Sequence, residues 1–225
     1  MSSTTFTRKQ MSEAMRLYAV TDRSFTGSST LYAQVESALL GGVTCVQLRE
    51  KDLDEQALLK EAVAIRDLCH RFHVPFLIDD NVSFAQKCDA DGVHVGQNDM
   101  PAAQVRTLLG PKKIIGVTAK TVEQAVSAER DGADYLGSGA VFHTSTKTDT
   151  SALPHDRLRD ICHAVSIPVC AIGGIGLSNI LELAGTDIDG VAIVSAIFSS
   201  PDITDTCSRL LTLSNQISND LKRKD

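Results

Sequence analysis

The sequence predicts one (β/α)₈ barrel of the TIM barrel type, and three observations support this fold class. Short apolar runs alternate with polar loops and amphipathic stretches about eight times along the chain. The runs are nearly continuously apolar, which is typical of parallel strands that are buried on both faces. A chain of 225 residues is also long enough for one such barrel. The alternative is an open doubly wound sheet, but the glycine pair and the VSA sequence that end the last two runs favour the barrel.

Each part of the chain has an expected place in this fold. Residues 1–16 are predicted to form an N-terminal extension with a short leading helix, residues 17–215 the barrel, and residues 216–225 a polar tail. Helices are expected over residues 53–72, from Pro101 and from Thr121, because of their apolar periodicity or their capping residues. The eight predicted strands begin at Leu17, Cys45, Phe76, Gly92, Ile114, Tyr135, Val169 and Val191.

The composition argues against several classes of partner. A net charge of −6 without a basic stripe disfavours a nucleic-acid surface. No apolar run approaches the roughly 18 residues that span a bilayer. The first residues also lack the pattern of a signal peptide, so we expect a cytoplasmic protein without a membrane partner. The six cysteines show no CxxC spacing and are expected to be reduced thiols. Small molecules are the expected partners, and a homo-oligomer is compatible with the sequence.

The end of the second predicted strand carries a set of polar residues. Gln47, Arg49 and Lys51 occupy alternating positions, so that strand geometry points all three side chains the same way. The planar fork of an arginine and the point charge of a lysine together suit a pyrophosphate. A strand end with solvated charges is the alternative interpretation of this segment.

Carboxylates follow the next two predicted strands. Asp79 and Asp80 end the third strand, and Asp99 lies just beyond the fourth. Carboxylates at adjacent strand ends can share Mg²⁺, which also binds phosphate oxygens. The alternative is that Asp80 and Asp99 are N-caps of the helices that follow them. His94, within the fourth strand, is interpreted as a core histidine more readily than as a catalytic one.

The last strands predict a site for a second phosphate. Gly173 and Gly174 end the seventh strand, and Val194 to Ala196 end the eighth, where barrels of this type commonly bind phosphate through backbone N–H groups. Glycines of a tight turn are the alternative. Thr118 adds a hydroxyl at the end of the fifth strand. After the sixth strand, Thr144, Ser145, Thr146 and Lys147 suit a cover for a departing pyrophosphate, or else form a surface loop.

These motifs together resemble the thiamine phosphate synthase family. The motifs are QLREK, IDD, HVGQND, GVTAKT, GAVFHTSTKTD, AIGGI and IVSAIF, in this order between Gln47 and Phe198, and the resemblance extends from Leu17 onward. It implies a transferase of thiamine biosynthesis that uses Mg²⁺. The reaction would join 4-amino-2-methyl-5-hydroxymethylpyrimidine diphosphate to 4-methyl-5-(2-hydroxyethyl)thiazole phosphate, or its carboxylated form, giving thiamine phosphate and pyrophosphate through a dissociative, carbocation-like mechanism.

The resemblance also implies a role for each matching residue. Gln47, Arg49 and Lys51 would bind the pyrimidine diphosphate, and Asp80 and Asp99 would hold Mg²⁺. Thr118 stands where the family usually has a serine near the pyrimidine, and Lys147 would contact the departing pyrophosphate. The thiazole phosphate would be bound by Thr144, Thr146, Gly174, Val194 and Ser195. Of these residues, the ones expected to act in catalysis are Arg49, Lys51, Thr118 and Lys147.

The chain departs from the family pattern at three positions. Asp79, which we expect to contact substrate, replaces a usual asparagine, and Ala140 and His143 replace usual prolines. These changes affect the pyrimidine contacts and the stiffness of the loop. Three other functions are alternatives: a related thiazole tautomerase, a catalytically silent sensor of a phosphate ligand, which these changes would suit, and a phosphosugar isomerase or aldolase. The last would require a Schiff-base lysine or paired catalytic carboxylates inside the strands, and no predicted strand core contains a lysine.

Overall fold

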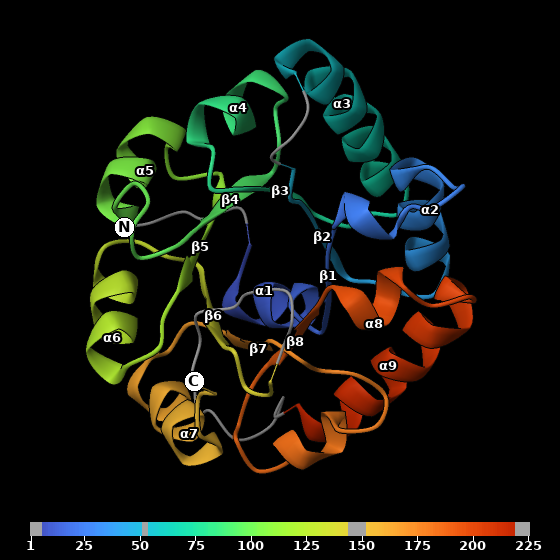
Figure 1. Ribbon diagram of the computed structural model, residues 1–225. Helices are drawn as coiled ribbons and strands as arrows, with labels where there is room; N and C mark the ends of the chain where they lie inside the picture. The colour runs from blue at the N-terminus through green and yellow to red at the C-terminus, as the bar shows by residue number, and fades with distance from the viewer. Residues whose placement is uncertain (1–5, 51–53, 144–151, 219–225) are drawn as a thin grey trace.

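The computed structural model describes residues 6–50, 54–143 and 152–218. In it, eight parallel strands form a closed barrel in which each strand pairs with the next one along the chain and β1 pairs with β8 (Figure 1). The predicted (β/α)₈ barrel is confirmed, and the open sheet is wrong. The strands are β1 (Leu17–Val20), β2 (Cys45–Leu48), β3 (Phe76–Asp79), β4 (Gly92–Val95), β5 (Ile114–Thr118), β6 (Tyr135–Gly139), β7 (Val169–Ile172) and β8 (Gly190–Ile193).

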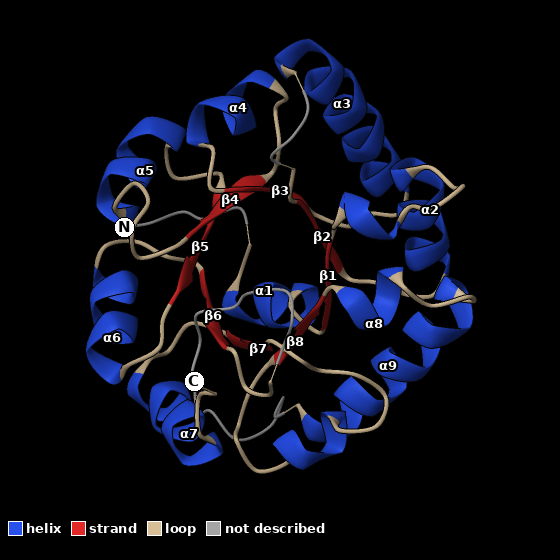
Figure 2. Ribbon diagram, viewed as in Figure 1, coloured by secondary structure: helices blue, strands red, loops and turns tan. Residues whose placement is uncertain are grey.

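A ring of helices surrounds the strands, and one further helix, the first in the chain order below, lies inside the ring of strands (Figure 2). The helices are α1 (Arg8–Ala14), α2 (Leu31–Leu40), α3 (Glu55–Arg71), α4 (Val82–Lys87), α5 (Ala102–Leu109), α6 (Val122–Arg130), α7 (His155–Ala164), α8 (Ser195–Phe198) and α9 (Ile203–Ile217), with 3₁₀ turns η1 (Arg23–Phe25) and η2 (Ile180–Leu183). The connection from β7 to β8 contains only η2, so the regular alternation of strand and α-helix fails at this one step. No described helix is long and apolar enough to cross a membrane.

The predicted helix starts are explained by their caps. Residues 53–72 were expected to be helical, and α3 begins after Asp54, whose carboxylate accepts hydrogen bonds from two backbone N–H groups of the first turn. Thr121 caps α6 in the same way by accepting from the N–H of Gln124. Pro101 lies directly before α5, and Gly110, at φ 74°, ends that helix.

The barrel has two apolar cores that meet at the strands. One lies between the strands and the outer helices, and the other fills the interior of the barrel. Met11, Ala14 and Met15, at or just after α1, belong to the interior core together with Tyr18 and Cys45. Figure 1 accordingly shows α1 within the ring of strands when the barrel is viewed from one end. Helix α1 therefore closes the N-terminal end of the barrel.

One type of contact recurs at this N-terminal end. It involves the residue that directly precedes each even-numbered strand. A side-chain oxygen of this residue accepts a hydrogen bond from the backbone N–H of a residue at the start of the strand before, at 2.8–2.9 Å. Its own N–H donates to the carbonyl of that same residue, at 2.7–2.9 Å. We call these two-way contacts strand-start pairs. The four pairs are Thr44 with Leu17, Asp91 with Phe76, Asp134 with Ile115, and Asp189 with Val169.

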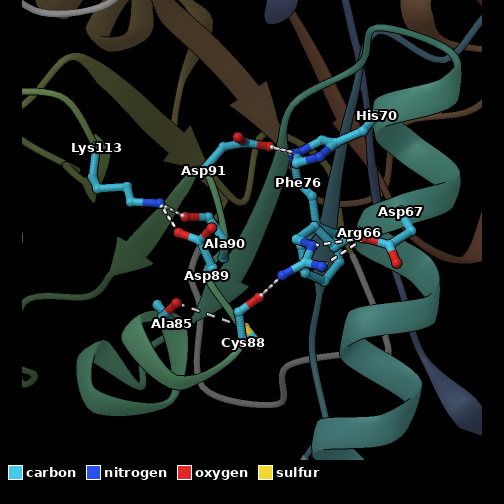
Figure 3. A network of polar contacts seen from close by, with 10 residues as sticks. All are labelled: Arg66, Asp67, His70, Phe76, Ala85, Cys88, Asp89, Ala90, Asp91 and Lys113. Atoms are coloured by element: carbon cyan, nitrogen blue, oxygen red, sulfur yellow. Dashed lines mark hydrogen bonds and ion pairs between the residues drawn. The ribbon is translucent and has the colours of Figure 1, made fainter.

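Each carboxylate of the strand-start pairs also meets a basic side chain. His70 Nε2 lies 2.9 Å from Asp91, Arg106 lies 2.7 Å from Asp134, and Arg8 lies 3.1 Å from Asp189. Figure 3 shows the first of these sites, in which neighbouring ion pairs and an Arg66 contact to the carbonyl of Cys88 extend the network. The basic partner comes from a helix each time, so these contacts join helices to the ends of the strands.

The cysteines agree with their expected reduced state. All six are free and buried. Burial raises the pKa of the thiols of Cys69 and Cys207 to about 12. The thiolate is the nucleophilic form, so these two groups are chemically unreactive in the folded protein.

Candidate active site

A cavity of about 420 Å³ opens at the C-terminal ends of the strands. It is lined by every predicted site residue that the structure describes: Gln47, Arg49, Asp79, Asp80, Asp99, Thr118, Gly174, Val194 and Ser195. Residues from widely separated parts of the sequence thus share one chamber. The other predicted site residues, Lys51, Thr144, Thr146 and Lys147, lie outside the described residues.

Strand β2 shows the alternation that the sequence predicts. Gln47 and Arg49 line the cavity, while Leu48 between them packs into the outer core. Glu50, the next residue, forms an ion pair with Arg23 outside the cavity. Neighbouring residues of this segment therefore serve opposite faces of the barrel wall.

Asp79 lies beside the guanidinium that we expect to bind diphosphate. Its carboxylate is 3.5 Å from Nε of Arg49, and both side chains are mostly buried. The backbone N–H of Arg49 donates a hydrogen bond to the Thr21 hydroxyl at 3.0 Å. The departure from the family asparagine therefore gives Arg49 a negative partner that an amide would not provide.

Asp80 and Asp99 both line the cavity, and neither caps a helix. The N-cap of α4 is Asn81, whose side chain accepts from the N–H of Phe84 at 2.9 Å. Asp80 instead has φ 60°, a conformation that is uncommon outside glycine and that often occurs at functional sites. The position before α5 is held by Pro101, and Asp99 accepts the N–H of Gly96 at 2.7 Å. The helix-cap interpretation of both aspartates is wrong.

The acidic residues of the cavity fit only one kind of metal site. Among the described residues there is no cluster of three or more histidine, cysteine or carboxylate side chains that could enclose a metal ion. Mg²⁺ commonly binds one or two carboxylates together with water and substrate phosphate. Asp80 and Asp99 fit a cation that arrives with a diphosphate, and they do not fit a cage made of protein ligands alone.

Five side chains form a continuous chain of hydrogen bonds at the cavity floor, which we call the floor chain. Gln47 Nε2 donates to the Tyr18 hydroxyl at 2.6 Å, and the hydroxyls of Tyr18 and Tyr135 are 2.9 Å apart. The Tyr135 hydroxyl lies 2.9 Å from His94 Nδ1, and His94 Nε2 lies 3.0 Å from the Thr118 hydroxyl. His94 is therefore a bonded interior histidine, as its first interpretation held, but it also lines the cavity.

Sequence reasoning missed Tyr18 and Tyr135, since an aromatic residue in an apolar strand is usually core. A signal for Tyr135 and for the ring of His94 lies in two glycines, one on β5 and one on β6. A Cβ atom at Gly116 would lie 2.1 Å from the ring of Tyr135, and one at Gly137 would lie 3.0 Å from the ring of His94. These two glycines leave the space that the rings occupy.

The opposite side of the cavity is built from backbone. Gly173 and Gly174 follow β7 with φ values of 102° and 68°, and a Cβ atom at Gly174 would lie 2.5 Å from the carbonyl oxygen of His143. Glycine is required there by conformation and by space. Strand β8 ends at Ile193, and Ser195 begins the short helix α8, where the sequence was expected to continue as a strand end.

One cation of the cavity was not proposed from the sequence. Lys120 lines the cavity beyond Thr118, two residues along the chain from it. The sequence contained a signal for Lys120, because it lies two residues after Thr118, as Arg49 lies two residues after Gln47, and alternate residues of a strand share a face. Nearby, Gln97 Nε2 donates to the carbonyl of Thr118 at 2.5 Å, which joins the segment after β4 to the end of β5.

Comparisons with known proteins show the family of the chain. The model of the thiamine monophosphate synthase family matches residues 17–197. A thiamine-phosphate synthase of Ruminiclostridium cellulolyticum is 46% identical over 197 residues, covering 88% of this chain and 94% of the relative. One from Clostridium tetani is 42% identical over 200 residues, covering 89% and 96%. The solved thiamine phosphate pyrophosphorylase of Pyrococcus furiosus superposes with a TM-score of 0.84 at 34% identity, covering 92% and 98% of the two chains. The chain belongs to the thiamine monophosphate synthase family.

Proposed function

We propose that this chain joins 4-amino-2-methyl-5-hydroxymethylpyrimidine diphosphate to 4-methyl-5-(2-hydroxyethyl)thiazole phosphate, giving thiamine phosphate and pyrophosphate. The carboxylated form of the thiazole would give the same products with the release of carbon dioxide. The observation that carries the proposal is the single cavity that gathers an amide, a guanidinium, carboxylates and glycine-rich backbone in a member of this family. Its volume of about 420 Å³ lies within the usual range for sites that bind small molecules.

The two sides of the cavity suit the two substrates. On the floor, Gln47 and Thr118 supply the amide and hydroxyl groups that hydrogen-bond a nitrogen heterocycle. Arg49, at the end of β2, supplies a cation for the diphosphate of the same substrate. Across the cavity, Gly174, Val194 and Ser195 supply the backbone surroundings for the phosphate of the thiazole.

Asp80 and Asp99 would hold Mg²⁺ together with the diphosphate. When bound, the ion would neutralise charge on the departing pyrophosphate. This assignment is supported by the placement of both carboxylates on the cavity that also contains Arg49. Lys51 and Lys147 remain predicted cations for the same diphosphate.

The reaction needs charge stabilisation more than proton transfer. The bond between the pyrimidine methylene carbon and the diphosphate oxygen breaks, and its electron pair leaves with pyrophosphate. The aminopyrimidine ring delocalises the positive charge that remains on the methylene. The thiazole nitrogen then donates its lone pair to form the new carbon–nitrogen bond. No proton moves at the reacting carbon, so Arg49 and the other cations serve by stabilising the leaving group. The barrel wall keeps water from capturing the cation.

The described strands disfavour one alternative function. None of the eight strands contains a lysine, so no strand of the barrel carries an amine for a Schiff base. An aldolase with its Schiff-base lysine on a strand is therefore disfavoured. A thiazole tautomerase, in turn, would have no use for a guanidinium and two carboxylates arranged toward a diphosphate.

The direct test is an assay with purified protein, both substrates and Mg²⁺, in which thiamine phosphate and pyrophosphate are separated and measured. We expect both products, and we expect none when EDTA is present. Asp80→Ala and Lys147→Ala should each reduce the rate at least about 100-fold. Asp67→Ala and Lys9→Ala are the matched controls, because both side chains are exposed and lie on helices, α3 and α1, away from the cavity, and both should retain full activity.

One outcome of the same assay would contradict the proposal. If the wild-type protein binds thiazole phosphate but forms no thiamine phosphate, the synthase function is wrong. Formation of an isomerised thiazole phosphate in that assay would identify a tautomerase, and binding without turnover would identify a sensor.

A further inference from the structure

The floor chain crosses the barrel and joins the two groups that face the pyrimidine. Its members come from β2, β1, β6, β4 and β5, and each hydrogen bond has a donor–acceptor distance of 2.6–3.0 Å. Gln47 stands at one end and Thr118 at the other, and both line the cavity. The three residues between them are Tyr18, Tyr135 and His94.

The direction of the hydrogen bonds follows from the first donor. Nε2 of Gln47 has only protons to offer, so the Tyr18 oxygen accepts there and its own proton goes to Tyr135. Tyr135 then donates to Nδ1 of His94, which must be the unprotonated ring nitrogen. The ring proton of His94 lies on Nε2 and is donated to the Thr118 oxygen. The Thr118 hydroxyl proton is left for the cavity.

Both tyrosines are built into the barrel as neutral hydroxyls. Tyr18 is 2% exposed and Tyr135 is 0% exposed. Burial raises the pKa of both hydroxyls well above their usual value, so each keeps its single proton at neutral pH. A hydroxyl with one proton can donate only one hydrogen bond. A tyrosine that accepts the bond on one side must therefore donate the bond on the other, which sets the direction of every bond along the floor chain.

The packing holds these rings in place. Tyr18 and Tyr135 meet edge to face with ring centroids 5.9 Å apart, and the rings of His94 and Tyr135 are 5.5 Å apart. Gly116 and Gly137 leave the space for the rings, since a Cβ atom at either position would approach one of them to 3.0 Å or less. The floor chain therefore has both a fixed geometry and a defined order of protons.

We propose that Tyr18, Tyr135 and His94 are positioning residues that make Gln47 present a hydrogen-bond acceptor, and Thr118 a donor, to the heterocycle on the cavity floor. The identity of that heterocycle as an aminopyrimidine rests on the proposed function. An exocyclic amino group would donate to Oε1 of Gln47, and a ring nitrogen would accept from the Thr118 hydroxyl. A ring with the opposite pattern would place an acceptor against Oε1 of Gln47 and a donor against the Thr118 hydroxyl, so neither hydrogen bond would form.

The order of protons can be measured without substrate. In ¹⁵N NMR of the ligand-free protein, His94 should carry its proton on Nε2 and none on Nδ1, with His94→Gln used to assign its signals among the six histidines. In Tyr135→Phe the Nδ1 signal should move toward that of a nitrogen without a hydrogen-bond donor. A proton on Nδ1 in the wild-type protein would overturn the proposal, because it would require the reverse order.

Kinetics test whether the order matters for recognition. Tyr18→Phe and Tyr135→Phe should each raise KM for the pyrimidine diphosphate about tenfold, and should change KM for the thiazole phosphate by less than about twofold. Tyr32→Phe is the matched control, because the third tyrosine of the chain lies on α2, accepts a hydrogen bond from Arg71 and does not line the cavity. Thermal unfolding of all three variants separates positioning from loss of the fold.

The two measurements distinguish this proposal from the proposed function. Unchanged KM for the pyrimidine diphosphate in folded Tyr18→Phe and Tyr135→Phe would overturn the floor chain as a positioning device and leave the synthase function intact. If the wild-type protein makes no thiamine phosphate, the synthase function is wrong, and the NMR result alone then decides whether the floor chain is ordered as proposed.

Discussion

The two ends of the barrel are built on different plans. At the N-terminal end, the strand-start pairs repeat one contact before every even-numbered strand. At the C-terminal end, the strands present different side chains, among them an amide, a guanidinium, carboxylates and a hydroxyl. A repeated contact suits a structural requirement that recurs around the barrel. Chemistry on two unlike substrates needs groups that do not repeat.

This difference predicts that stability and activity can be altered separately. The polar groups of the strand-start pairs are bonded within the protein, so their loss leaves buried partners unsatisfied. The cavity presents polar groups to a ligand, so their loss affects the free protein less. Substitutions at the N-terminal end should therefore lower stability and spare activity, and substitutions at the cavity should lower activity and spare stability.

The largest effect is expected at the cavity. Arg49→Gln should lower kcat/KM about 10³-fold, since it removes a cation from the departing pyrophosphate, and should change the free energy of unfolding by less than about 0.5 kcal/mol. Steady-state kinetics and urea unfolding measure the two quantities. Arg130→Gln, on the exposed surface of α6, is the control and should alter neither. A large loss of stability in Arg49→Gln would remove the distinction between the two ends.

Next in size are the carboxylates of the strand-start pairs. Asp189, Asp134 and Asp91 make the same contact with side chains that are 2%, 10% and 30% exposed. Replacement by alanine should cost about 3, 2 and 1 kcal/mol of unfolding free energy in that order, because an unsatisfied group costs more where it is more buried. Urea unfolding gives these values, and kcat of each folded variant should stay at the wild-type level. An equal loss at all three positions would show that burial does not set the cost.

Thr44, the neutral member of the set, should give a smaller loss of stability than Asp189 or Asp134. The Thr44 hydroxyl accepts from the N–H of Leu17 at 2.8 Å and donates to the carbonyl of Ala14 at 2.9 Å. Thr44→Val keeps the shape and removes both bonds, and it should cost about 1 kcal/mol. Chemical denaturation alongside Asp189→Ala makes the comparison. A greater loss for Thr44→Val than for Asp189→Ala would argue against a role for charge in the strand-start pairs.

The smallest effect is expected from the departure at Asp79. Asp79→Asn should lower KM for the pyrimidine diphosphate about threefold, because it releases Arg49 from its carboxylate partner and removes one negative charge from the site. Asp202→Asn makes the same chemical change at the N-cap of α9, away from the cavity, and should have no effect on KM. A higher KM in Asp79→Asn would show that this carboxylate contributes a needed contact with the substrate.

The fold was predictable because its signals are local. Apolar runs buried on both faces marked all eight strands, apolar periodicity marked α3, and Thr121 marked the start of α6 through its cap. The site was predictable where a polar residue ends a strand, as with Gln47 and Arg49. The replacement of an α-helix by η2 between β7 and β8 was not predictable. Nothing in the local sequence of this glycine-containing connection distinguishes a short 3₁₀ turn from an α-helix.

The remaining errors share a physical cause. Asp80 and Asn81 are both good capping residues, and only the backbone conformation of Asp80 decides between them. Tyr18 and Tyr135 are distant in the sequence, so their bond depends on the closure of the barrel. Contacts that exist only after closure leave no pattern within a single segment of the chain.

The placement of α1 has a consequence for synthesis on the ribosome. Helix α1 closes the barrel by packing into its interior, and Arg8 and Ser12 bond to Asp189, which lies 181 and 177 residues further along the chain. Helix α1 therefore cannot make these contacts until Asp189, the residue directly before β8, has been synthesised. Until then the apolar side chains of α1 and the open end of the half-made barrel are both uncovered. Nascent chains that end before β8 should depend on chaperones, and release of the last strand should be the step that commits the chain to its folded state.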